Sequence, residues 1–189
     1  LEIARKSLTQ IGPEAHLFAN NKARVKGIQI GTAGNNLLFN RLSERDDFRE
    51  IKLDQKEPAI SDIDISPKDV LLLSIYPPSV KPADNFGFSK HIIRFINDLL
   101  RANQVTVCLF GNPYFLYLLD LKPHHTALIA YQQFDEFQIE IFTQQLQHGD
   151  VDCNTSHIDP AGKPLCLLFG RGFDDPMADF INETVFLRL

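Results

Sequence analysis

A polar cluster of side-chain types that can bind metal lies in the last quarter of the chain. It consists of His148, Asp150, Asp152, Asn154 and His157. The D-x-D-x-N spacing suggests a calcium loop, which needs glycine at its sixth position and a bidentate glutamate at its twelfth. Thr155 and Ala161 stand at those positions. A zinc site built from His148, Cys153 and His157 would have no usual spacing. The sequence therefore predicts a solvated loop here, and we expect neither a metal nor a cofactor.

Covalent catalysis also lacks a recognisable signature. There is no G-x-S-x-G nucleophile elbow and no Cys–His pair at a known spacing. Cys108 and Cys166 fall in apolar runs, where cysteine usually serves as a small buried hydrophobe, and Cys153 falls in a loop. His124 and His125 are adjacent, so they would point to opposite faces of a strand. We interpret both histidines as loop residues.

Carboxylates could support glycoside hydrolysis, which needs two of them at a defined separation across the scissile bond. Asp135, Glu136 and Glu140 are the candidates. Asp135 and Glu136 also stand where a helix is predicted to begin, and the helix macrodipole favours carboxylates at that end. Sequence spacing alone does not decide between these interpretations, although the structural one needs fewer assumptions.

Glycine turns offer a third kind of site. Gly31-x-x-Gly34 follows one apolar run, and Gly111-Asn112 follows another. The full G-x-G-x-x-G pattern and the Walker A motif are absent. A tight strand-to-helix turn needs glycine for conformational reasons alone. A free-standing doubly wound module that binds a nucleotide or small anion, through residues 31–36 and 111–112, is therefore the alternative function.

Apolar runs bounded by turn residues predict the strands that would position these side chains. Strands buried on both faces are indicated by continuous runs at Val70–Ile75, Val105–Phe110 and Thr126–Tyr131. Other strands are predicted at Val25–Ile30, at Phe48–Leu53 with the alternation of an edge strand, and at Leu165–Leu168. Helices are predicted at residues 37–42, 88–101 and 135–147, and Asn112-Pro113 begins another. Residues 1–10 form at most a short amphipathic helix.

This order predicts an α/β fold, a three-layer sandwich whose mostly parallel sheet has five or six strands and helices on both faces. We place the domain at residues 1–168 and assign residues 169–189 to a tail or the start of a linker. The 189 residues are 44% hydrophobic, which suits one globular core. The net charge of −5, without a basic cluster, argues against nucleic acid or an anionic membrane as a partner. No apolar run is long enough to span a membrane.

Four motifs occur in an order known from one enzyme family. Ala4-Arg5-Lys6-Ser7-Leu8 comes first, followed by Gly111-Asn112-Pro113 after a strand, Asp135-Glu136-Phe137-Gln138 at a helix start, and Gly162-Lys163-Pro164-Leu165 before a last strand. Together they resemble the carboxyl-terminal α/β sandwich domain of glycoside hydrolase family 3, over about residues 4–168. The last two residues of the fourth motif are inverted relative to the family pattern.

The resemblance implies that the catalytic nucleophile lies outside this chain, on an Asp of an upstream (β/α)8 barrel. In the β-glucosidase branch, the second domain lends an acid/base Glu from the loop that corresponds to residues 76–84. That loop contains no Glu here, and Asp84 is its one carboxylate. The chain therefore looks more like the β-N-acetylglucosaminidase branch, in which a His–Asp pair of the barrel performs the acid/base work.

We therefore expect an accessory domain of a family 3 glycoside hydrolase acting in carbohydrate metabolism on β-N-acetylglucosaminides, with no catalytic residue of its own. Ligands of open α/β sheets bind outside the carboxyl ends of the strands. The substrate-proximal candidates at those ends are Tyr76, Asp84, Asn112, Tyr114 and Gln132. The expected partners are the barrel and a glycan substrate, and a periplasmic or secreted location is favoured over a cytoplasmic one.

Overall fold

The computed structural model describes residues 8–13, 17–18, 24–31, 36–53, 58–66, 69–130, 136–148 and 154–156. Its strands are β1 (Thr9–Ile11), β2 (Val25–Gly31), β3 (Phe48–Ile51), β4 (Val70–Tyr76), β5 (Val105–Phe110), β6 (Thr126–Ala130) and β7 (Asn154–Ser156). Its α-helices are α2 (Leu37–Leu42), α3 (Lys90–Ala102) and α4 (Glu136–His148), and its 3-10 helices are η1 (Ile60–Asp62), η2 (Ala83–Gly87) and η3 (Pro113–Leu118).

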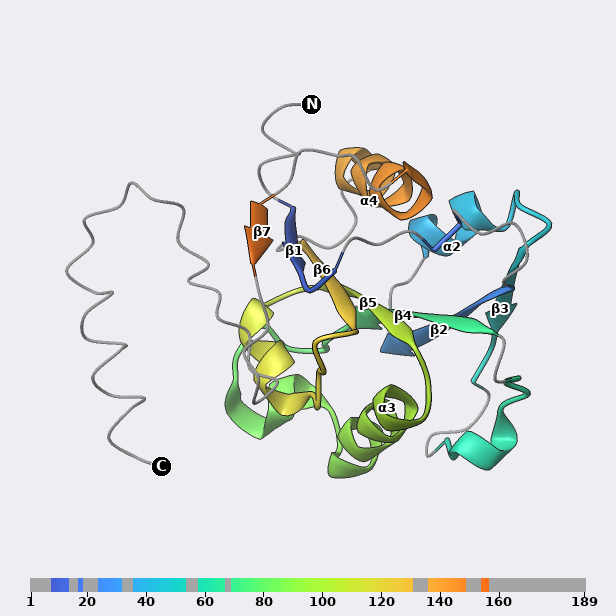
Figure 1. Cartoon of the computed structure of the whole chain (residues 1–189). Coiled ribbons are helices and arrows are strands. Elements are labelled where there is room, and N and C mark those ends of the chain that lie inside the picture. Colours follow the sequence, from blue (N-terminus) through green and yellow to red (C-terminus); the bar gives the residue numbers. More distant parts are fainter. Residues whose placement is uncertain are drawn as a thin grey trace, which may run out of the picture.

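The strands form one seven-stranded sheet in the order β3-β2-β4-β5-β6-β1-β7. Neighbouring strands from β3 through β6 are parallel, whereas β1 pairs antiparallel with β6. Helix α3 covers one face, and α2 and α4 cover the other (Figure 1). The expected three-layer α/β sandwich with a mostly parallel sheet is therefore confirmed, and β3 lies at the edge as its alternating sequence predicts.

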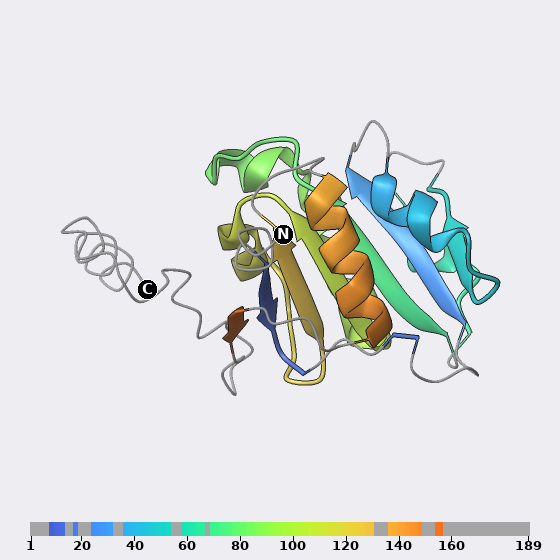
Figure 2. The same ribbon diagram turned by 90° about the horizontal axis from the view of Figure 1, so that it is seen from above.

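Two apolar cores lie on opposite faces because alternate residues of a strand point to opposite sides. Leu73 and Val107 pack with α3 residues such as Ile96, whereas Leu72 and Cys108 belong to the core beneath α2 and α4. Seen from above, α2 and α4 lie side by side over the same face (Figure 2). Every residue of β5 and β6 is buried, which explains why their sequences show no alternation.

The first expected helix is wrong where the structure describes it. Thr9–Ile11 is strand β1, which pairs with β6 through Ile11 and Ala127, while residues 1–7 lie outside the described ranges. A free edge of β6 supplies backbone partners that a short helix would lack. Leu8 and Ile11 also enter opposite cores. Packing against a distant strand thus overrides the local pattern.

Within the described residues the sheet has seven strands, one more than the upper end of the expected five or six. Both additions are three-residue strands at one side of the sheet, β1 and β7. Residues 154–156 were expected to be loop, but they pair in parallel with β1. The strand expected at Leu165–Leu168 and the helix-ending Gly149 lie outside the described residues.

The segment after β5 is a 3-10 helix, η3, rather than an α-helix. Asn112 caps it as expected, since its Oδ1 accepts a hydrogen bond from the Tyr114 N–H at 3.0 Å, and Pro113 occupies the first turn. Helices α2 and α3 begin in the same way. The Asn36 and Ser89 side chains accept hydrogen bonds from the N–H groups of Phe39 and Ile92.

Candidate functional site

The loop between β4 and α3 shapes the carboxyl end of the sheet. Asp84, Asn85 and Phe86 have left-handed backbone, with φ of 52°, 53° and 58°. Such geometry costs about 1–2 kcal/mol per non-glycine residue. Phe86 offsets that cost by burying its ring, which packs edge-on against Phe115 at 5.7 Å between centroids. The loop is therefore held in one conformation by its own buried anchor.

Asn112 ties this loop to η3. Besides capping η3 through Oδ1, it donates a hydrogen bond from Nδ2 to the Val80 carbonyl oxygen at 3.0 Å. Both ends of the amide therefore have backbone partners. Asn112 thus positions the surface around it.

Exposed apolar side chains come from both segments that Asn112 joins. Within the described residues, the exposed large hydrophobic side chains are Val80 (70% exposed), Tyr114 (38%) and Tyr117 (56%). Side chains three residues apart eclipse one another on a 3-10 helix. The Tyr114 and Tyr117 rings accordingly stack, with centroids 6.0 Å apart and planes at 22°. We call Val80, Tyr114 and Tyr117 the carboxyl-edge surface.

Tyr76 lies beneath this end of the sheet, in the core. Its ring is buried and stacks on Phe110 at 4.8 Å, and its hydroxyl is 3.3 Å from Asn36 Oδ1. Burial raises the pKa of Tyr76 to about 12. The phenol is thus a neutral structural group, and it presents little surface to a ligand.

The other candidates are placed differently. Asp84 is exposed on η2, Tyr114 is partly exposed on η3, and Gln132 lies outside the described residues. The structure brings Asn112 and Tyr114 together with Val80. Substrate contact by any of the five remains a prediction.

The carboxylates considered for glycoside hydrolysis do not form a described pair. Asp135 lies outside the described residues, and Glu136 begins α4. Glu140 accepts a hydrogen bond from Arg41 at 2.9 Å, which joins α4 to α2 on the surface. The contact seen for Glu140 therefore links two helices.

The glycine turns have structural explanations in the parts that are described. A Cβ at Gly31, where φ is +85°, would lie 2.0 Å from the Tyr76 carbonyl oxygen. A Cβ at Gly111 would lie 3.2 Å from the Pro77 ring. Residues 32–35 lie outside the described ranges. Close backbone packing and a positive φ therefore account for Gly31, and Gly111 lies tightly against the Pro77 side chain.

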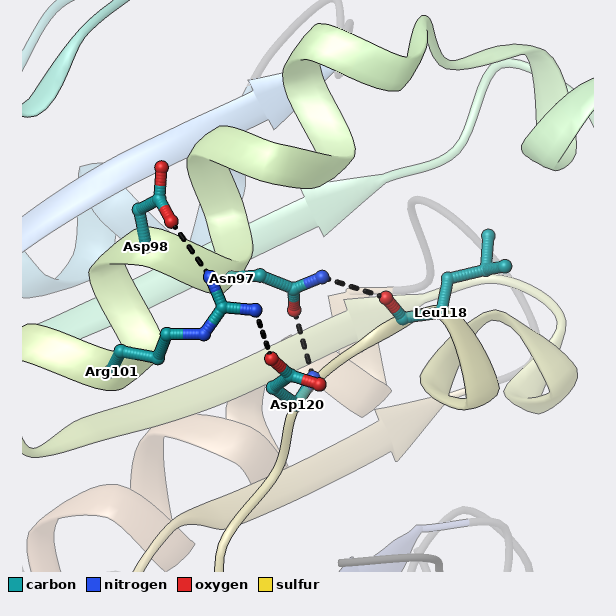
Figure 3. Close-up of polar contacts among 5 residues, drawn as sticks. All are labelled: Asn97, Asp98, Arg101, Leu118 and Asp120. Carbon is teal, nitrogen blue, oxygen red and sulfur yellow. Dashed lines mark hydrogen bonds and ion pairs between the residues drawn. The ribbon is translucent and has the colours of Figure 1, made fainter.

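The opposite, amino end of the sheet holds a polar pocket of about 340 Å³. It is lined by Asp69, Val70, Arg101, Ala102, Asn103, Gln104 and His124. Arg101 forms ion pairs with Asp98, at 2.9 Å, and with Asp120 (Figure 3). The Asn97 side chain donates a hydrogen bond to the Leu118 carbonyl oxygen at 3.0 Å and accepts one from the Asp120 N–H at 2.8 Å. These contacts fasten the β5–β6 connection to α3.

Asp69 forms the most enclosed ion pair at this end. Its Oδ2 lies 2.9 Å from Lys26 Nζ and accepts a hydrogen bond from the Ser66 N–H at 2.7 Å. Burial alone would raise the pKa of the Asp69 carboxyl, but the hydrogen bonds outweigh burial and hold that pKa below 3.8. Asp69 is therefore an anion at neutral pH.

The described residues contain neither a metal-binding cluster nor a membrane-spanning helix. No group of three or more His, Cys, Asp or Glu side chains in these ranges is arranged to hold a metal ion. No helix among them has the length and apolar character needed to cross a membrane.

Comparison with known proteins gives little further information. No protein-family model matches the chain, and no curated protein matches it. A solved structure named beta-glucoside phosphorylase BglX aligns with it at a TM-score of 0.48 and 16% identity. The alignment covers 78% of this chain and 28% of that protein. A likeness this distant decides neither the family nor the activity of the chain.

Sequence reasoning missed two features of the site. Tyr117 was not a candidate, although its spacing from Tyr114 would reveal the stacked pair if a 3-10 helix were assumed after Asn112-Pro113. The amino-end pocket was missed because its lining comes from separate segments. No local motif signals such a site.

Proposed function

We propose that this chain is a non-catalytic accessory domain of a family 3 glycoside hydrolase. In this proposal an upstream (β/α)8 barrel carries the nucleophile, and the substrate is a β-N-acetylglucosaminide. The observation that carries the proposal is the character of the carboxyl edge, where a fixed loop and η3 present apolar side chains. The motif order in the sequence supplies the family.

The chemistry at this edge supports a contact role. Asp84 is the one carboxylate in the loop of residues 76–84, and a single carboxylate does not supply the pair that glycoside hydrolysis uses. Tyr114 and Tyr117 instead belong to the aromatic type that is enriched at protein interfaces, and Val80 adds exposed apolar area. The carboxyl-edge surface would pack on the barrel and form one wall of the sugar site.

The test uses the parent enzyme that contains this chain. Tyr114→Ala/Tyr117→Ala removes the stacked pair, and we expect kcat/KM for a chromogenic N-acetylglucosaminide to fall at least about tenfold, equivalent to about 1.4 kcal/mol. His124→Ala changes an exposed aromatic side chain at the opposite edge and should leave kcat/KM unchanged. Equal activity of both variants would overturn the contact role. A parent protein without a barrel would overturn the family assignment.

A further inference from the structure

His125 closes the turn that leads into β6. Its backbone N–H donates to the Lys122 carbonyl oxygen at 2.8 Å, and its imidazole Nδ1 accepts a hydrogen bond from the Lys122 N–H at 3.0 Å. Nδ1 needs a free lone pair to accept this bond, so the ring is neutral and its proton is on Nε2. We call this pair of hydrogen bonds the His125 clasp, and its side-chain half exists only while the imidazole is uncharged.

The surroundings of the ring oppose a positive charge. The side chain is fully buried, and Nε2 has no hydrogen-bond partner among the described residues. The ionisable groups that act on it are His124, whose ring centroid is 4.2 Å away, and Lys122, and both are cationic when protonated. The carbonyl groups of Leu100 in α3 and of Asn103 just after it favour the charged form, although neither makes a hydrogen bond to Nε2. Burial first, and His124 second, lower the pKa of His125 below 6.5.

The clasp lies where β1 joins the sheet. A Cβ at Gly12 would lie 2.1 Å from the His125 carbonyl oxygen, so the chain after β1 rests directly on this residue through backbone atoms. The next residue, Thr126, donates a hydrogen bond from Oγ1 to the Pro13 oxygen at 2.9 Å. Ile11 then pairs with Ala127. A shift of this turn would therefore disturb the pairing of β1 with β6 first.

The contacts on either side limit how far such a shift could spread. Asn97 holds Leu118 and Asp120, just before the turn, against α3. Beyond the turn, β6 pairs with β5 from Thr126 to Ala130. The β1 side of β6 has only a three-residue partner.

We propose that the His125 clasp is an acid-operated latch that holds β1 against β6 in the sheet. A proton added to Nδ1 removes the acceptor for the Lys122 N–H and leaves a cation on a buried side chain. The turn then opens, and β1 loosens from β6 while the central strands remain paired. This behaviour is independent of the proposed glycosidase role, because His125 lies at the amino end of the sheet and the carboxyl-edge surface lies at the carboxyl end.

The experiment is an NMR titration of the whole chain from about pH 7 to about pH 4.5. Imidazole nitrogen shifts report the His125 tautomer and its protonation, and amide hydrogen exchange reports opening. We expect the Nε2–H tautomer at pH 7, and a fall of at least about tenfold in protection at Lys122 and in β1 as His125 takes up its proton. Leu72 in β4 should keep its protection. The Nδ1–H tautomer at pH 7, unchanged protection, or an equal fall at Leu72 would each overturn the latch.

Two variants separate the latch from general acid effects. In His125→Asn, Oδ1 can replace the Nδ1 acceptor but does not titrate, so the protection of Lys122 should be the same at both ends of the pH range. His124→Asn removes the neighbouring exposed ring and should keep the pH response. A pH response that persists in His125→Asn, or disappears in His124→Asn, would contradict the proposal. If His125→Asn folds poorly, the His125 tautomer and the amide hydrogen exchange of the unmodified chain still test the proposal.

Discussion

The two ends of the sheet are held together by different interactions. At the carboxyl end, Asn112 bonds to backbone groups, and buried rings such as Phe86 and Phe110 fix the loops. At the amino end, charged pairs such as Lys26–Asp69 and Arg101–Asp120 link the elements, and the uncharged His125 closes a turn. One sheet therefore has a carboxyl end held by neutral contacts and an amino end held by ionisable groups.

This difference indicates which end of the sheet should respond to pH and salt. Neutral hydrogen bonds and aromatic packing keep their strength over a wide range of pH and salt, so the carboxyl edge offers a constant shape for contact. Ion pairs weaken when a partner is neutralised, and exposed pairs also weaken with salt. Structural changes with pH or salt should therefore occur mainly at the amino end of the sheet.

Phe110→Ala should break the carboxyl end most strongly. The ring is buried between Tyr76 and Phe142, with centroid distances of 4.8 Å to each. Its loss should lower the free energy of unfolding by about 3–5 kcal/mol, through lost burial and the cavity left behind. Urea denaturation would measure this loss, which should be similar at pH 5 and pH 8. A loss that varies steeply with pH would show that ionisable groups also support this end.

Lys26→Met should destabilise the amino end by about 1–3 kcal/mol at pH 7, because Asp69 keeps its charge but loses its cation. The folded-state pKa of Asp69 is lowered, so its stabilising effect is present above the unfolded pKa and is lost as pH falls through the folded value. The difference from the unmodified chain should therefore shrink between pH 7 and pH 3 in denaturation experiments.

Arg41→Met is the matched control for that change. It removes the same kind of charge from the exposed Arg41–Glu140 pair, where solvent screens the interaction. We expect a loss of less than about 0.5 kcal/mol. Equal losses in Arg41→Met and Lys26→Met would show that burial of the Lys26–Asp69 pair has no special effect.

Tyr114→Ala/Tyr117→Ala should have only a small effect on folding. Both rings are substantially exposed, so we expect less than about 1 kcal/mol from the loss of their mutual stacking. Thermal unfolding of the isolated chain would measure it. A loss as large as that of Phe110→Ala would mean that the carboxyl-edge surface is part of the core.

The central strands could be predicted because each is a continuous apolar run, and a run such as Val105–Phe110 has few alternatives to a buried strand. Strand β1 could not be predicted, because three residues carry little pattern and because its partner, β6, lies more than 100 residues away in the sequence. The position of Tyr76 at a strand end was predicted, but its burial follows from strand alternation, which directs its ring beneath α2 and α4. Tyr117 required the 3-10 geometry of η3.

The claim that this chain lacks catalytic activity of its own is tested most directly by a hydrolysis assay. The isolated chain would be incubated with a chromogenic N-acetylglucosaminide beside a sample carrying Asp84→Asn. We predict that neither sample releases the chromophore faster than buffer. Turnover by the unmodified chain that disappears in Asp84→Asn would contradict the account, because it would make Asp84 a catalytic residue of this domain.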